Sequence, residues 1–412
     1  MERPGVAMLA PARDSARDQR EMADPTKYAI FRSYAPKDWK VDFEVQMIPY
    51  ELKTTACWIG LISVTSSTAL AGGIERRGDP SQILFEEGRN YLEFSVGTVR
   101  PTVSGVPLSG IPAGPTGNIA NSYQAFALGY KRDLNDRVTL AFVVDEPVGA
   151  SLDYSNALAF FGGSSAEVTS IAYTALARYR ISDRVSVYGG LRLIGVDGTI
   201  TVISPASTPS PYDLSVSKDF QLGYLAGIAY EIPDIAFRIA ATYESRTRHD
   251  FRDNGGSPFE VEIPQAVTVH AQTGIAADTL VFGSVRWREW SEFRVQPADF
   301  FSLVPGVGPV NTPIASGTSD IWTYELGIGR QFTENWSGAV AIGYERDLGD
   351  TVGNFSGTDG FISYSVAVSY EVESWQVTTG LTFFELGSAD SSVTAFSGND
   401  GVSAGLQVSY TF

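Results

Sequence analysis

The stretch "SIAYTALARYRISDRVSVYGGLRLIG", residues 170–195, alternates between apolar and polar side chains on both sides of a short Ser-Asp turn. The apolar positions before the turn fall on one side of an extended chain: Ile171, Tyr173, Ala175, Ala177, Tyr179 and Ile181. Strict alternation over this length predicts a strand with one apolar and one polar face. Because the turn is so short, the two halves are expected to pair as an antiparallel hairpin.

The same unit recurs along the chain and predicts fourteen strands, near residues 90–101, 121–132, 136–147, 169–181, 184–197, 217–231, 235–248, 265–275, 278–290, 320–332, 335–347, 359–372, 375–387 and 400–412. Short connections such as 333–335 alternate with long Gly/Pro/Ser-rich connections such as 104–118. An even strand number with short turns on one side and long loops on the other is typical of outer-membrane barrels. We therefore predict an all-β fold, a 14-stranded antiparallel transmembrane outer-membrane β-barrel over residues 90–412.

A soluble β-sandwich is the competing fold. Its strands would be nearer to about 5–6 residues long, and its polar faces would be turned to solvent. Here several arginines lie on the polar faces of the predicted strands, which suits a watery lumen. Tyrosine and tryptophan also recur near strand ends, as expected for side chains at a membrane–water boundary. These patterns favour the barrel.

The C-terminal stretch "SAGLQVSYTF" has an apolar face that ends on a terminal aromatic residue, Phe412. It resembles the last-strand signal that the outer-membrane assembly machinery recognises in Gram-negative bacteria. The pattern predicts that machinery as a partner through Phe412. It also predicts the outer membrane as the location and its lipid as the surroundings.

An apolar run, "ACWIGLISVTSSTALAGG", begins at residue 56, after a positive charge at Lys53 and before the A-x-A site Ala69-Leu70-Ala71. This order is that of an export signal. The run is shorter than the roughly 20 residues that a spanning helix needs. We interpret residues 47–71 as a signal peptide and residues 1–46 as a non-native upstream extension. A buried core helix is the alternative interpretation of the run.

Composition excludes several function classes. The formal net charge of the chain is −17 at pH 7, which argues against nucleic acid as a partner. Cys57, the only cysteine, lies in the expected signal peptide, so no disulfide, thiol chemistry or cysteine metal site is expected. The histidines, His249 and His270, belong to no Ser–His catalytic motif. We therefore expect no enzyme and no cofactor.

Residues 72–89, "GGIERRGDPSQILFEEGR", precede the first strand and do not alternate. Folded back into a fourteen-stranded barrel, this segment would obstruct a lumen that otherwise leaks. We predict that it forms a short N-terminal plug, with these residues as its contacts: Ile74, Arg76, Arg77, Ile83, Leu84 and Phe85. A periplasmic tail is the alternative.

Five segments, taken in order, resemble the FadL/toluene-transporter family of long-chain fatty acid and aromatic hydrocarbon transporters of the outer membrane. They are "AFVVDEPVGASLDY" (141–154), "YTALARYRISDRVSVYGGLRLIGV" (173–196), "IAFRIAATYESRTRHDFR" (235–252), "EIPQAVTVHAQTGIAADTLVFGSVRWREWSEF" (262–293) and "IWTYELGIGRQFTENWSGAVAIGYERD" (321–347). The second carries the family's Ser-Asp-Arg turn, and the fourth carries its Trp-x-x-Trp. The resemblance extends over nearly the whole of the expected mature chain.

The resemblance implies a monomeric barrel that takes up hydrophobic small molecules by passive, plug-gated diffusion. Ligand would leave sideways through a gap beside the third strand, at the Pro-x-Gly of Pro147 and Gly149. No metal, nucleotide or covalent chemistry is implied. One departure is that the family's plug is longer and carries Asn-Pro-Ala, whereas this chain has Asp79-Pro80-Ser81 in a comparable place. That departure bears on the details of gating.

Ligand contacts are predicted from chemistry. A fatty-acid carboxylate would pair with inward-facing arginines, for which alternation indicates Arg178, Arg180, Arg192, Arg238, Arg286 and Arg288. Apolar clusters on the long loops indicate a capture surface, namely Phe160, Phe161, Phe300, Phe301 and Leu303. The competing functions are a general diffusion porin, which would have no plug, and a surface adhesin, in which binding would follow the loops.

Overall fold

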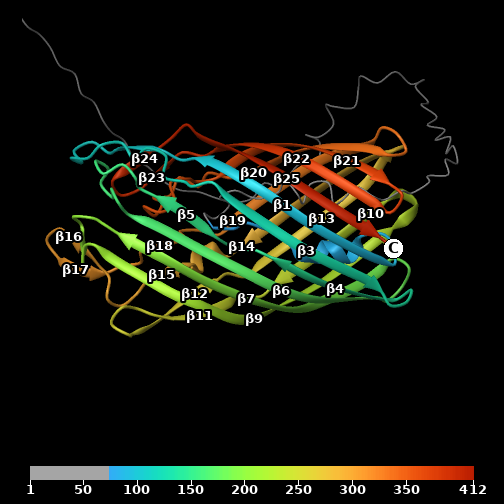
Figure 1. The fold of residues 1–412 in the computed structure, drawn as a ribbon, viewed down its shortest axis with the longest axis horizontal. Coiled ribbons are helices and arrows are strands. Elements are labelled where there is room, and N and C mark those ends of the chain that lie inside the picture. The colour runs from blue at the N-terminus through green and yellow to red at the C-terminus, as the bar shows by residue number, and fades with distance from the viewer. Residues whose placement is uncertain (1–73) are drawn as a thin grey trace, which may run out of the picture. The chain divides into compact units, whose positions relative to one another are not determined.

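The computed structural model describes residues 74–412, so the expected upstream extension and signal peptide lie outside the described residues. Fourteen antiparallel strands close into one barrel (Figure 1). In chain order they are β1 (Asn90–Thr102), β3 (Tyr123–Asp133), β4 (Val138–Asp145), β6 (Ser165–Arg180), β7 (Val185–Val202), β9 (Tyr212–Ile232), β10 (Phe237–Glu244), β13 (Ala266–Ala276), β14 (Thr279–Arg288), β19 (Ile321–Gln331), β20 (Trp336–Glu345), β21 (Phe361–Val372), β22 (Trp375–Leu386) and β25 (Asn399–Thr411). The predicted fold class is confirmed.

The barrel closes between its first and last strands. β1 pairs with β25 in a continuous register from Tyr91 opposite Thr411 to Thr102 opposite Asp400. The backbones of Asn90 and Phe412 exchange two hydrogen bonds, with N–O distances of 3.1 and 3.0 Å. The terminal residue therefore completes the ring and leaves no free sheet edge at the seam.

Side chains alternate between lipid and lumen as the sequence predicts. On β6 the outward Tyr173 and Tyr179 are exposed, whereas the inward Thr174 and Arg178 are buried. Aromatic pairs lie near the short turns: the rings of Trp336 and Tyr370 are 4.8 Å apart, and those of Trp375 and Tyr410 are 4.6 Å apart. The outer face thus carries an apolar band with an aromatic border.

Two predicted strands are interrupted. The strand expected over 136–147 ends at Asp145 and resumes as β5 (Ala150–Asp153). Pro147, which has no amide hydrogen to donate to a ladder, lies in the break. The strand expected over 235–248 also ends early, at Glu244, and the chain then bends into a separate strand. Both breaks occur in the half of the barrel that carries the long loops.

The long connections form small sheets at the end of the barrel opposite the C-terminus (Figure 1). Their strands are β2 (Gly105–Pro107), β8 (Ser207–Thr208), β11 (Thr247–Arg252), β12 (Pro258–Ile263), β15 (Arg294–Val295), β16 (Phe301–Val304), β17 (Gly308–Asn311), β18 (Ala315–Ser316), β23 (Ala389–Asp390) and β24 (Thr394–Phe396). Short 3-10 turns are η3 (Pro80–Phe85), η4 (Pro233–Ile235) and η5 (Trp290–Glu292). Within residues 74–412, no helix has both the length and the apolar character to cross a bilayer.

Candidate functional site

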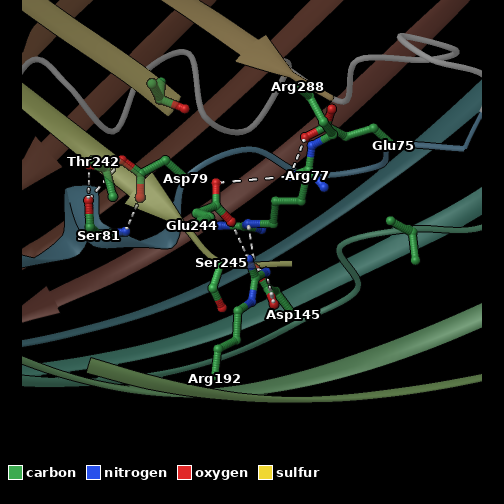
Figure 2. A network of polar contacts seen from close by, with 12 residues as sticks. Glu75, Arg77, Asp79, Ser81, Asp145, Arg192, Thr242, Glu244, Ser245 and Arg288 are labelled. Atoms are coloured by element: carbon green, nitrogen blue, oxygen red, sulfur yellow. Dashed lines mark hydrogen bonds and ion pairs between the residues drawn. The ribbon is translucent and has the colours of Figure 1, made fainter. Parts of the chain in front are cut away.

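The N-terminal segment, residues 74–89, lies inside the barrel, where η3 contacts β3, β4 and β6. Asp79 caps η3 by accepting a hydrogen bond from Ser81 N at 2.8 Å, and Pro80 occupies the first turn, where a missing amide hydrogen costs nothing. Thr242 Oγ1 of β10 donates to Asp79 Oδ2 at 2.7 Å (Figure 2). One carboxylate therefore shapes the turn and fastens it to the wall.

The charge of Asp79 is stabilised where it lies. Burial acts to raise the pKa of Asp79, but the nearby His270 ring and the donors Thr242 and Ser81 outweigh burial and hold that pKa below its ordinary value. His270 Nε2 lies 3.6 Å from Asp79 Oδ2. The cap consequently stays ionised at neutral pH.

Phe85 fixes the C-terminal end of η3 to the barrel wall. Two guanidinium groups lie over its ring, with Arg178 Cζ 4.3 Å and Arg238 Cζ 4.4 Å from the ring centroid. Tyr188 meets the same ring edge-on at 5.5 Å. Cations over an aromatic face are attracted by its quadrupole, so the strands hold this ring by packing and by charge.

A network of buried ions crosses the lumen beside η3 (Figure 2). Arg286 of β14 donates to Glu75 at 2.9 Å and to Glu244 at 2.8 Å. Arg192 of β7 donates to Glu244 at 2.7 Å and lies 3.1 Å from Asp145. Each of these buried charges is paired with an opposite charge, which offsets the free-energy cost of removing it from water.

Most of the predicted lumen arginines are part of such pairs. Arg178 is paired with Glu231, and Arg288 Nη2 lies 3.2 Å from Glu75 Oε1. Arg238 stacks on Phe85, as described. Arg180 lies at the rim, where it donates to the backbone carbonyl of Asp136 at 3.2 Å. The network therefore joins the N-terminal segment to the wall, and four of the six arginines already have carboxylate partners: Arg178, Arg192, Arg286 and Arg288.

The acidic partners were not singled out from the sequence. Glu244 and Asp145 lie on inward positions of their strands, so the same alternation that indicated the arginines could have found them. Glu75 precedes every strand, and alternation gives no information about where its side chain points.

An apolar cavity of about 50 Å³ lies among β6, β7, β9 and the β11–β12 hairpin. Its walls include residues of these strands and of the N-terminal segment: Ile74, Val168, Val196, Asp197, Gly198, Ile200, Leu214, Val216, Phe251, Phe259, Val261, Ile263, Phe293 and Val295. Asp197 is the charged residue among them. Cavities lined by apolar side chains with few polar groups are the usual form of sites for hydrophobic ligands.

The N-terminal segment also covers the break between β4 and β5. Gly149 N donates to Ile74 O at 2.7 Å, and Arg76 N donates to Pro147 O at 2.9 Å. Glu75 and Val148 form an isolated antiparallel bridge. β3 and β4 pair only as far as Ala127 opposite Asp145, so the segment hydrogen-bonds to wall residues that have lost their neighbouring strand.

The predicted capture residues have different environments. Phe161 and Phe300 are 8% and 5% exposed, so the expectation of exposed rings does not hold for them. Phe161 packs 5.9 Å from the Tyr154 ring, and Phe300 packs 5.2 Å from the Tyr212 ring. Phe160 and Phe301 are half-buried. Leu303 is 41% exposed and belongs to β16, at the outer end of the barrel.

The fold defines an outer-membrane β-barrel whose lumen holds the N-terminal segment. The sequence model of the family described as "Outer membrane protein transport protein (OMPP1/FadL/TodX)" matches residues 98–347, and the chain belongs to this family of outer-membrane transport proteins. The protein is therefore located in the outer membrane of a Gram-negative bacterium. A comparison with curated protein sequences finds no match.

Solved structures share the fold at low sequence identity. A FadL homologue from Pseudomonas aeruginosa superimposes with a TM-score of 0.66 at 12% identity, covering 81% of this chain and 93% of that one. The toluene transporter TodX from Pseudomonas putida gives 0.59 at 11% identity, covering 84% and 98%. The toluene transporter TbuX from Ralstonia pickettii gives 0.57 at 13% identity, covering 84% and 97%.

Proposed function

We propose that this protein takes up hydrophobic molecules, long-chain fatty acids or related hydrocarbons, by passive diffusion through the barrel and a lateral opening in its wall. The N-terminal segment is the plug that gates this route. The observation that carries the proposal is the position of Ile74, whose side chain lines the apolar cavity while its carbonyl oxygen is bonded to Gly149 in the wall break. Occupation of the cavity and opening of the break would therefore act on the same residue.

The energetics suit this route. An alkyl chain gains about 0.8 kcal/mol for each methylene that moves from water to apolar surroundings. An aqueous pore gives no such gain, whereas the cavity and the lipid outside the break do. The ligand would first contact the exposed Leu303 on the outer face and would then bind in the cavity. Transport down a gradient then needs no energy source.

A reversible cross-link tests the gate. Glu75 and Val148 form an antiparallel bridge, in which Cα atoms lie about 4.5–5.5 Å apart, within the range that a disulfide spans. Glu75→Cys/Val148→Cys should fix the segment to the break when oxidised. We expect uptake of a radiolabelled fatty acid to stop on oxidation and to return on reduction. Each single variant, with and without oxidation, controls for the lost side chains.

Uptake that is equal in the oxidised and reduced double variant would contradict lateral gating. Deletion of residues 73–88 separates a plugged transporter from the alternative, a general diffusion porin: conductance in planar bilayers should rise sharply if the segment obstructs the lumen. Unchanged conductance would count against the plug. For the other alternative, an adhesin, deletion of the gene would leave uptake of hydrophobic molecules unaltered.

A further inference from the structure

Two neighbouring short turns carry a cluster of arginines at the end of the barrel where the C-terminus lies (Figure 1). The β3–β4 turn has Arg132 and Arg137, and the β6–β7 turn has Arg180 and Arg184. Arg180 is half-buried, and the other three are exposed. Within residues 74–412, none of these four rim arginines forms an ion pair, unlike most arginines of the lumen.

The two turns are held side by side by their backbones. Arg180 N donates a hydrogen bond to Arg137 O at 2.8 Å. Inside the turns, the side-chain oxygen of Asn135 accepts from Arg137 N at 2.9 Å, and the hydroxyl of Ser182 accepts from Arg184 N at 3.3 Å. The backbone positions of the rim arginines are therefore fixed relative to one another.

The carboxylates of these turns do not cancel the cations. Asp133 is engaged by Lys131, whose Nζ lies 2.9 Å from Asp133 Oδ2. Asp136 and Asp183 are the other carboxylates of the two turns. Arg89 adds a further cation beside them, because its carbonyl oxygen accepts a hydrogen bond from Asp133 N at 2.7 Å. This part of the rim is thus basic, although the chain has a formal net charge of −17.

The turns that follow β9 along the chain have the opposite charge. They carry Asp234, Asp278, Glu334 and Glu373, and Arg330 is the basic residue at these turns. Basic charge is therefore concentrated on one arc of the rim. The strands of that arc, β3, β4 and β6, are also the strands that border the wall break.

Apolar side chains accompany the rim arginines. Leu134 and Ile181 are exposed in the turns, and Tyr130 and Tyr179 are exposed on the outer faces of β3 and β6. Arg132 follows Tyr130 by two residues, so both point to the same outer face. In outer-membrane barrels the short turns face the periplasm, and aromatic residues mark the membrane–water boundary. The rim arginines therefore lie at the level of the phospholipid headgroups of the periplasmic leaflet.

We propose that the rim arginines bind the phosphate of an anionic phospholipid whose acyl chains lie along the outer faces of β3, β4 and β6. Guanidinium groups match phosphate oxygens in paired hydrogen bonds, and cations beside a membrane are attracted to anionic lipid. The exposed Leu134 and Ile181 favour a lipid over an acidic periplasmic protein or free phosphate, because lipid would bury them at the acyl boundary. The inference does not depend on which molecule the barrel transports.

The test measures which phospholipid the exported protein retains. Purified, delipidated protein is mixed with micelles that contain equal amounts of phosphatidylglycerol and phosphatidylethanolamine with the same acyl chains, and no transport ligand is added. Native mass spectrometry then counts the bound lipids, and wild-type protein should prefer phosphatidylglycerol. Arg137→Gln/Arg184→Gln should reduce that preference by about ten-fold or more, since each cation near a lipid surface contributes several-fold. Arg137→Lys/Arg184→Lys should retain part of it, because the charge remains.

Arg330→Gln is the matched control. Arg330 is also exposed at the end of a strand, near the exposed Phe332, but it lies among the acidic turns. This variant should keep the lipid preference, and the urea-unfolding midpoints of both variants should equal that of wild type, because exposed substitutions cost little stability.

Equal retention of the two lipids by wild-type protein would overturn the proposal, and so would a loss of preference in Arg330→Gln as large as in the double variant. Displacement of phosphatidylglycerol by inorganic phosphate would assign the arginines to a free anion and would also overturn it. The same holds if wild-type protein has no lipid preference but captures an acidic periplasmic protein that the double variant does not.

Discussion

Arg286 Nε donates a hydrogen bond to Glu75 Oε1 at 2.9 Å across 211 residues of sequence, and both side chains are buried. The pair ties the start of the N-terminal segment to β14, on the side of the lumen away from the wall break. Glu75 also forms the bridge with Val148. One residue therefore links the ion network, the N-terminal segment and the break.

Removal of the Glu75 carboxylate should loosen the segment. Glu75→Gln removes one carboxylate partner from Arg286 and one from Arg288, and leaves Glu244 as the partner of both. We expect it to cost about 3 kcal/mol of stability, the lower end for a broken buried pair, because Glu244 remains. The midpoint of urea unfolding in lipid vesicles measures this loss. Arg248→Gln is the control, since Arg248 pairs with Glu262 in an exposed loop and its removal should not shift the midpoint. Equal midpoints for both variants would contradict the role of the network.

Phe85→Ala should release the C-terminal end of η3 from the barrel wall. The substitution removes a ring that contacts the guanidinium groups of Arg178 and Arg238, and the expected loss is about 3 kcal/mol from packing and cation–π attraction together. Phe85→Leu keeps most of the volume and should lose only about 1 kcal/mol, the cation–π part. Limited proteolysis of the segment, with urea unfolding of the barrel, distinguishes release of η3 from general unfolding. Equal effects of the two variants would exclude a specific contribution of the ring.

The β11–β12 hairpin should loosen in mild acid. Burial lowers the pKa of His249 below its ordinary value of 6.5, although Asp219, whose Oδ2 lies 3.4 Å from Nδ1, acts in the opposite direction. The folded hairpin thus binds fewer protons than the opened one as pH falls below 6.5. The stability that neutral His249 contributes is complete above pH 6.5 and is lost as pH drops toward the lowered pKa.

Protease sensitivity of the hairpin should therefore increase from pH 7 to pH 5, and His249→Gln should remove most of that dependence. Phe251 and Phe259 of this hairpin line the cavity, so ligand binding should weaken over the same interval. Sensitivity that is flat with pH in the wild-type protein would show that His249 is not the titrating group that matters.

Substitutions at Leu303 and Phe300 should distinguish a role in ligand capture from a role in loop packing. Leu303→Asp changes an exposed side chain and should slow uptake several-fold with no change in unfolding midpoint, because an exposed substitution costs little stability. Phe300→Asp places a carboxylate against the Tyr212 ring and should destabilise the loop. Initial uptake rates at low ligand concentration give the first result. Unaltered rates in Leu303→Asp would remove this residue from the capture surface.

Strand positions were predictable because alternation is a local property of the chain. The predicted hairpin at 169–181 and 184–197 is observed as β6 and β7, with the expected side chains turned to lipid. The interruptions were less accessible: the Pro147 break carries a local signal, whereas the bend after Glu244 depends on how the hairpin folds over the cavity. Arginine positions on the lumen face were likewise predictable, but their partners were not.

The sequence by itself determined the barrel, because the two-residue period, the turn lengths and the terminal aromatic residue are all local features of the chain. Only the tertiary structure decided what fills the lumen. Glu75, Asp145, Glu244 and Arg286 come from separate elements, and their pairing depends on barrel closure, which brings distant strands face to face. The same closure left Arg76 without a carboxylate partner among the described residues, and no local pattern distinguishes it from Arg77 beside it.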